Sequence, residues 1–163
     1  EMQYITNGFI QQGPVNRYLR KCASFMHIAE AFATRSHDPS SKVGAIILGP
    51  AYDVRASGWN GAPRNCKADT DHRYDNREEK LWWVTHAEAN AIANAARVGT
   101  SVEGCTLVCT HMTCMTCAKL IAQSGIIHVI CIDPTVDFSL RWHDDIKHTK
   151  ELFTELGLTL ILI

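Results

Sequence analysis

The chain has 163 residues, of which 46% are hydrophobic and 20% are charged. This length and mixture indicate one globular domain with a sizeable core, and they argue against disordered and fibrous proteins. The formal net charge of -1 argues against a protein that holds a long nucleic-acid backbone, because such proteins usually carry a basic surplus.

The chain begins with a stretch of mixed polarity and then becomes regular. Residues 1–14 contain two glycines and a proline, and we expect them to form a flexible N-terminal arm before a single domain at residues 15–163. From Val15 to about Arg35, apolar residues recur at three- and four-residue steps, which predicts an amphipathic helix. The following SHDPSSK ends this pattern, because Pro39 cannot continue a helix.

A predicted hairpin and a long loop follow. Residues Val43–Gly49 form a short β-branched run bounded by glycines, which predicts a buried strand, and VRASGW at 54–59 is its expected partner. The stretch from Asn60 to about Lys80 is polar and predicts a long surface loop. Such long loops in compact domains are usually functional or mobile.

The second half alternates helices with strands. An alanine-rich helix is predicted from about His86 to Arg97, and Gly99 ends it. The remaining predicted elements are a strand at 105–111, a helix at 115–125, a strand at 126–132, a helix at 142–156 and a strand at 158–163. This alternation predicts a three-layer α/β/α sandwich around a five-stranded mixed sheet that is covered on both faces.

Two short motifs place reactive side chains at the starts of two predicted helices. His86 and Glu88 open the first helix, and Cys114 and Cys117 open the second. Cysteines at i and i+3 project from the same side of a helical turn, where the helix dipole favours thiolates. Two thiolates and one imidazole suit zinc, and the fourth tetrahedral position is left for water, as in a catalytic site.

Glu88 is expected to have a different role from the three ligands. It lies two residues beyond His86, about 200° around an ideal helix, so it cannot easily be a neighbouring ligand of the same ion. It can reach a bound water, which predicts a proton shuttle. CxxC alone would equally fit a redox pair, half a structural zinc site or two buried thiols, and HxE alone a helix-start histidine. The combination of the two motifs favours the zinc site.

H-x-E followed by C-x-x-C is the described signature of zinc deaminases. The chain resembles the deoxycytidylate (dCMP) deaminase family through DPSSKVGAIIL, GWNGAP, HAEANAI and CAKLIAQSGI, over about residues 35–132. The resemblance implies a cytidine-deaminase-like fold and hydrolytic deamination of dCMP to dUMP and ammonia, feeding dTMP synthesis. One departure is Thr113, which replaces the family's proline before Cys114 and concerns the rigidity of that turn.

The resemblance also implies roles for residues outside the two motifs. Asn60 would hold the sugar hydroxyl, and the backbone N–H of Ala87 would hold the base carbonyl. Ser41 and Lys42 are the candidates for the 5′-phosphate. Two alternatives stay open: Asn-Gly is a common turn pair, and Lys42 is equally well an ordinary solvated lysine.

Regulation, assembly and metal content follow from the same resemblance. Many family members are activated by dCTP and inhibited by dTTP, and the matching effector segment contains Gly58, Trp59, Asn60 and Gly61. Mg²⁺ is expected to accompany a triphosphate effector, and a homo-oligomer (trimer or hexamer) is expected. Some viral members bind a second zinc, but the matching positions here are Asn76, Lys80 and Val84. One zinc per chain is therefore expected.

Two other functions stay open at this point. The first is another zinc deaminase, acting on free cytidine or deoxycytidine, guanine or a tRNA adenosine, although the near-neutral charge argues against tRNA. The second is a non-catalytic nucleotide-binding relative with a structural zinc, against which the presence of Glu88 argues. Seven cysteines without a signal-peptide pattern predict a reducing, cytoplasmic setting, and no apolar run approaches the roughly 20 residues that span a membrane.

Overall fold

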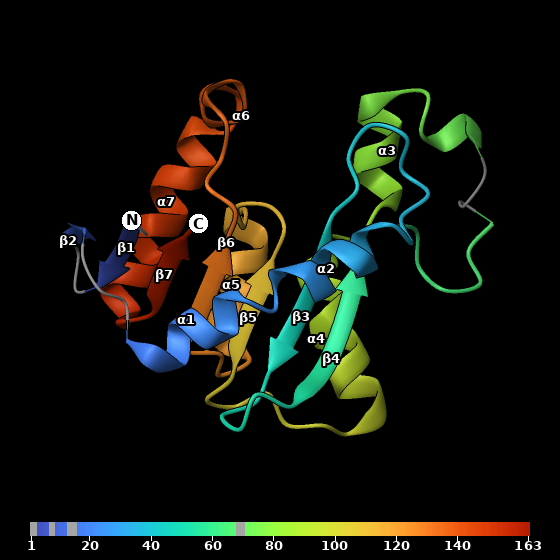
Figure 1. Ribbon diagram of the computed structural model, residues 1–163. Coiled ribbons are helices and arrows are strands. Elements are labelled where there is room, and N and C mark those ends of the chain that lie inside the picture. Colours follow the sequence, from blue (N-terminus) through green and yellow to red (C-terminus); the bar gives the residue numbers. More distant parts are fainter. Residues whose placement is uncertain (1–2, 7–8, 13–15, 68–70) are drawn as a thin grey trace.

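The structure is a computed structural model that describes residues 3–6, 9–12, 16–67 and 71–163 (Figure 1). Its elements, in chain order, are β1 (Gln3–Thr6), β2 (Phe9–Gln12), α1 (Arg17–Ala23), α2 (Met26–Ala33), β3 (Gly44–Leu48), β4 (Val54–Trp59), the 3₁₀ helix η1 (Asp71–Arg73), α3 (Arg77–Trp83), α4 (Ala87–Val98), β5 (Thr106–Cys109), α5 (Met115–Gln123), β6 (His128–Cys131), α6 (Val136–Arg141), α7 (His143–Leu156) and β7 (Thr159–Leu162).

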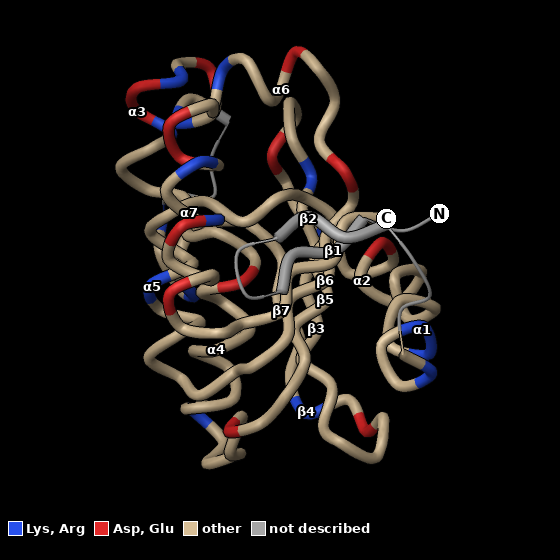
Figure 2. The backbone as a smooth tube through the Cα atoms, turned by 90° about the vertical axis from the view of Figure 1, so that its left-hand side faces the viewer, with Lys and Arg blue, Asp and Glu red and all other residues tan. Residues whose placement is uncertain are grey.

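One mixed sheet runs through the molecule in the order β2-β1-β7-β6-β5-β3-β4. Strands β5, β6 and β7 are parallel, whereas β3 pairs antiparallel with both β4 and β5. Helices α1 and α2 cover one face, and α4, α5 and α7 cover the other (Figure 2). The predicted three-layer α/β/α sandwich is confirmed.

The sheet has two strands more than predicted, because part of the expected N-terminal arm belongs to it. Strands β1 and β2 form an antiparallel hairpin, and β1 pairs with β7. The prediction of an arm outside the domain is thus wrong for residues 3–6 and 9–12. The physical reason is that β7 would otherwise expose a row of unpaired backbone groups, which β1 satisfies. Residues 1–2, 7–8 and 13–14 of the predicted arm lie outside the described residues.

The first predicted helix is two helices. Helix α1 ends at Ala23 and α2 begins at Met26. The hydroxyl of Ser24 donates to the carbonyl of Lys21 at 2.7 Å, and this local hydrogen bond competes with continuation of the helix. The apolar spacing was therefore correct, but it did not show the break.

Two further helices were missed. Helix α3 occupies the end of the predicted 60–80 loop and continues to Trp83, and α6 lies where no helix was expected. Asn76 and Thr135 cap these helices by accepting hydrogen bonds from backbone N–H groups at 2.8 and 3.4 Å. Neither helix has a buried residue, so neither left an amphipathic pattern in the sequence.

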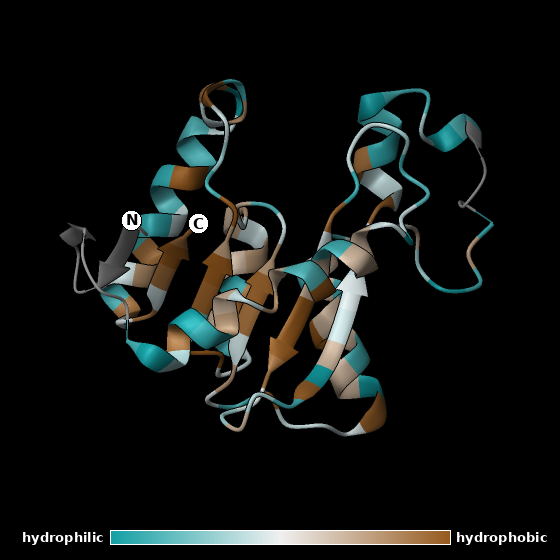
Figure 3. Cartoon of the chain, viewed as in Figure 1, coloured by the Kyte–Doolittle hydropathy of each residue, from teal (hydrophilic) through white to brown (hydrophobic). Residues whose placement is uncertain are grey.

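The central strands separate two apolar cores and are buried along their lengths (Figure 3). This burial follows from helices on both faces, which require apolar residues at successive strand positions. The larger core lies under α4, α5 and α7, and includes Ile47, Leu107, Val129, Phe153 and Leu160. Strands β5 and β6 end at the same edge of the sheet, near which α5 begins, and this edge carries the candidate site. None of the helices in the described ranges combines the length and apolar character needed to cross a bilayer.

Candidate active site

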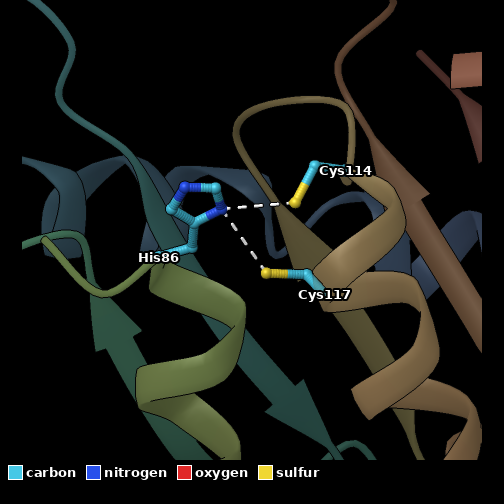
Figure 4. A group of neighbouring side chains, drawn as sticks. All are labelled: His86, Cys114 and Cys117. Carbon is cyan, nitrogen blue, oxygen red and sulfur yellow. Dashed lines mark hydrogen bonds between the residues drawn. The ribbon is translucent and has the colours of Figure 1, made fainter. Parts of the chain in front are cut away.

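Two helix starts bring one imidazole and two sulfur atoms together. His86 is the N-cap of α4, Cys114 is the N-cap of α5, and Cys117 lies one turn into α5. The Nδ1 atom of His86 lies 3.4 Å from the Sγ of Cys114 and 3.5 Å from the Sγ of Cys117 (Figure 4). Within the described part of the chain, this is the one group of three or more such side chains with metal-binding geometry.

The dimensions of this cluster fit zinc. A tetrahedral ion with Zn–S bonds of about 2.3 Å and Zn–N bonds of about 2.0–2.1 Å places its sulfur and nitrogen ligands about 3.6 Å apart. The nitrogen–sulfur separations of 3.4 and 3.5 Å match that value. Three protein ligands leave one tetrahedral position, as is typical of catalytic zinc sites.

The protons of the cluster are shared in a way that a cation can replace. Hydrogen bonding to Cys114 raises the pKa of His86 to about 9, although burial opposes this shift. The hydrogen bond with Cys117 lowers the pKa of Cys114 to about 4, and the same bond raises the pKa of Cys117. The two thiols therefore lose their protons in two widely separated steps, and a bound metal would supply the positive charge that the second thiolate needs.

The start of α4 is fixed against the neighbouring strand. A side chain at Gly58 of β4 would place its Cβ 2.4 Å from the carbonyl oxygen of Ala87, so only glycine permits this approach. The side-chain amide of Asn90 donates to the carbonyl of Trp59 at 2.8 Å, and Gly61 pairs with the residue before His86. His86 thus starts its helix from a position that the sheet determines.

The start of α5 is held by a residue that sequence reasoning missed. The carboxylate of Asp145, on α7, accepts a hydrogen bond from the backbone N–H of Met115 at 2.6 Å. Its negative charge also contributes to the raised pKa of His86. Asp145 lies 30 residues further along the chain, so no local pattern could have connected it with the CxxC motif.

Glu88 is buried beside the cluster, at 4% exposure. Burial raises the pKa of its carboxyl, against hydrogen bonds from its own backbone N–H and the Thr113 side chain and the charge of His86. Thr113 is fully buried, and its hydroxyl also lies 3.8 Å from the Sγ of Cys131. The residue that replaces the family's proline therefore contacts the predicted proton shuttle directly.

A cleft of about 680 Å³ leads to the cluster, a volume typical of small-ligand sites. Its lining includes His86, Ala87 and Glu88, together with Asn60 and Ser41. The structure thus brings these sequence-predicted residues to one cleft. As the first residue of α4, Ala87 also has a backbone N–H without an acceptor inside the helix.

Asn60 sits in a network of buried polar groups. Its Oδ1 accepts from the backbone N–H of Val43 at 2.8 Å, and its Nδ2 donates to the carbonyl of Ser41 at 2.8 Å. Asp38, which sequence reasoning missed, accepts from Asn60 at 3.4 Å and forms an ion pair with Lys80 at 2.9 Å. The Asp-Pro-Ser pattern at 38–40 was the available sign of this turn, because aspartate often accepts from backbone two residues ahead, as it does from Ser40 here.

Other predicted residues lie outside the cleft or have packing roles. Lys42 is not among the residues that line the cleft, although its neighbour Ser41 is. In the predicted effector segment, Trp59 stacks on Phe32 with ring centroids 6.3 Å apart. Of the positions considered for a second zinc, Asn76 caps α3 and Lys80 pairs with Asp38.

Comparisons with known proteins agree with this geometry. The family described as the cytidine and deoxycytidylate deaminase zinc-binding region matches residues 19–133, more than half of the chain. An uncharacterized deaminase of Aliivibrio fischeri is 38% identical over 133 residues, which cover 82% of this chain and 86% of that protein. The human deoxycytidylate deaminase is 37% identical over 148 residues, covering 87% of this chain and 79% of that protein.

A solved structure gives a similar result. The dCMP deaminase from the cyanophage S-TIM5, in complex with dCMP and dUMP, superposes with a TM-score of 0.69. It is 26% identical, and the match covers 92% of this chain and 100% of the phage protein. The likeness therefore extends over nearly the whole domain.

Proposed function

Because the chain belongs to the cytidine and deoxycytidylate deaminase family, we propose that it catalyses the hydrolytic deamination of dCMP to dUMP and ammonia. The observation that carries this proposal is a buried carboxylate, Glu88, beside a His86, Cys114 and Cys117 cluster with the dimensions of a zinc site. The choice of dCMP is supported by the names of the human and cyanophage proteins to which the chain is similar.

The cluster and Glu88 divide the chemistry between them. Zinc held by His86, Cys114 and Cys117 supplies a Lewis acid that brings the pKa of a water toward 7. Glu88 takes a proton from the attacking water and delivers it to ring N3 of the base. It then helps to protonate the departing C4 amino group as ammonia. The burial that raises the pKa of Glu88 suits this double role, because both of its protonation states become accessible near neutral pH.

Three residues on the cleft wall are proposed to orient the nucleotide. The free N–H of Ala87 donates to the carbonyl oxygen of the base. Asn60 holds the sugar hydroxyl through the second lone pair of its Oδ1, since the first accepts from Val43. Ser41 contributes its hydroxyl near the phosphate end. Lys42 is the alternative phosphate contact suggested by the sequence.

Regulation and assembly are proposed on the sequence resemblance alone. Residues 58–61 would mediate activation by dCTP and inhibition by dTTP, with Mg²⁺ bound to the triphosphate. The functional unit would be a homo-oligomer with one zinc per chain. Activity measured with each triphosphate in the presence of magnesium tests the regulation, and an unchanged rate with both would remove it.

The direct test of the function is ammonia release from dCMP, with dCTP and deoxycytidine as competing substrates. Zinc-loaded wild-type protein should deaminate dCMP fastest. Glu88→Gln should keep the zinc and the circular-dichroism spectrum but lose about 10²–10⁴-fold in rate, the usual value of general acid–base help. Zinc-loaded protein that releases no ammonia from any of the three would contradict the proposal, and an active Glu88→Gln variant would contradict the role of Glu88.

A further inference from the structure

Three cationic side chains other than histidine line the cleft, and only one of them is neutralised by a partner. The Nζ of Lys80 lies 2.9 Å from Asp38 and 2.8 Å from the hydroxyl of Ser40, and its side chain is 15% exposed. Arg77 and Arg141 are exposed instead. Within the described ranges, neither arginine has a carboxylate at ion-pair distance, although Asp75 lines the same cleft.

The two arginines come from opposite walls of the cleft. Arg77 begins α3 and Arg141 ends α6, and these helices stand on two sides of the sheet edge (Figure 1). The guanidinium carbon of Arg77 nevertheless lies 5.8 Å from the centroid of the Trp142 ring, next in sequence to Arg141. Arg77 therefore extends across the cleft, and this cation–π contact helps to orient its guanidinium group. Figure 2 shows charges of both signs on this end of the molecule.

The depth of the cleft sets the orientation of a nucleotide in it. Glu88 and the metal-binding cluster lie at the buried end, so the base with its C4 amino group must enter first. Asn60, proposed for the sugar, lies between this end and the loop of Ser41. The 5′-phosphate must then face the open end, where the exposed arginines are.

We infer that Arg77 and Arg141 bind the 5′-phosphate of the substrate from the two walls of the cleft and make the enzyme specific for a nucleotide over a nucleoside. This inference rests on the proposed function. Guanidinium groups match the geometry of phosphate oxygens and form charge-assisted hydrogen bonds with them. Two arginines would neutralise a phosphate dianion, whereas Lys80 is already paired with Asp38 and Lys42 does not line the cleft.

The test compares Arg77→Gln, Arg141→Gln and the double variant with two controls. Arg20→Gln removes an equally exposed arginine on α1, on the opposite face of the sheet, and Lys42→Gln tests the alternative phosphate contact. Zinc-loaded proteins are assayed for ammonia release from dCMP and from deoxycytidine. Calorimetric binding of dUMP and deoxyuridine gives a readout that does not depend on turnover.

Each arginine variant should lower kcat/KM for dCMP about 10- to 100-fold, mainly through KM, and weaken dUMP binding by a similar factor. Turnover of deoxycytidine and binding of deoxyuridine should stay within about twofold of the wild type, and Arg20→Gln should match the wild type throughout. Equal loss with nucleotide and nucleoside, no loss, or a selective loss in Lys42→Gln instead would each overturn the inference. Wild-type protein that binds dUMP through the arginines but deaminates nothing would refute the proposed function and leave the phosphate site standing.

Discussion

The floor and the mouth of the cleft are built on different principles. At the floor, α4 and α5 start directly against the central sheet, and both helices bury several residues. At the mouth, α3 and α6 have no buried residue, and Trp82 and Leu140 on them are 84% and 72% exposed. The floor holds reactive atoms at fixed separations, whereas the mouth depends on side-chain pairing. Chemistry and substrate selection are therefore expected to respond to different mutations.

The largest expected effect belongs to the floor. Cys117→Ser should weaken zinc binding by more than the roughly 10–100-fold that loss of an outer partner causes, because it removes a ligand itself. Zinc content by elemental analysis and turnover should fall together. Cys66→Ser, in the long loop outside the cluster, is the matched control and should retain both. A Cys117→Ser variant with full zinc content would show that the floor is not a metal site.

A smaller effect is expected where the mouth is joined to the domain, at the pair of Asp38 and Lys80. Removing one partner of a buried pair costs about 3–5 kcal/mol, and Asp38→Asn should cost somewhat less, about 2–3 kcal/mol, because the Lys80 amine can turn toward the water in the cleft. Denaturant unfolding measures this difference. Lys147→Gln, in an exposed pair with Glu151, is the control and should change the free energy of unfolding by less than about 1 kcal/mol.

The same pair predicts a pH dependence. Burial alone would raise the pKa of Asp38, but hydrogen bonds from Lys80 and Ser40 outweigh it and hold the pKa below its usual range. The folded state thus binds this proton less readily than the unfolded state. The stability that Asp38 contributes should be complete above about pH 4 and lost as the pH falls through the folded-state value. A wild-type advantage over Asp38→Asn that grows on acidification would contradict this account.

The link between α7 and the floor should have an effect of about 1 kcal/mol. Asp145→Ala removes the acceptor for the Met115 N–H at the start of α5, and the loss of such a helix cap typically costs this much. Asp144→Ala, on an exposed neighbour paired with His143, is the matched control. Equal thermal stabilities of the two variants would show that α7 does not hold the CxxC turn.

The smallest expected effect concerns Thr113. Thr113→Val keeps the shape of the side chain but removes the hydroxyl that hydrogen bonds to Glu88, a contact worth about 1 kcal/mol. The kcat for dCMP should fall about fivefold at unchanged KM, and Thr113→Ser should restore it. A change in KM alone would place Thr113 with the residues that bind substrate rather than with the proton shuttle.

The contrast between floor and mouth also explains what the sequence could predict. His86, Glu88, Cys114 and Cys117 were identifiable because short spacings on helices fix which side chains meet. The five inner strands were identifiable because burial on both faces leaves continuous apolar runs. Arg77 and Arg141 gave no such sign, since they lie on short exposed helices that meet only across the folded cleft. The N-terminal strands were missed because their place in the sheet depends on β7, at the far end of the sequence.

The most direct test of the account is a zinc titration of zinc-free protein that records ammonia release from dCMP. We predict that activity rises in proportion to added zinc and reaches a plateau at one equivalent per chain. Activity that is independent of zinc, or a plateau at two equivalents, would contradict the assignment of His86, Cys114 and Cys117 as a single catalytic metal site.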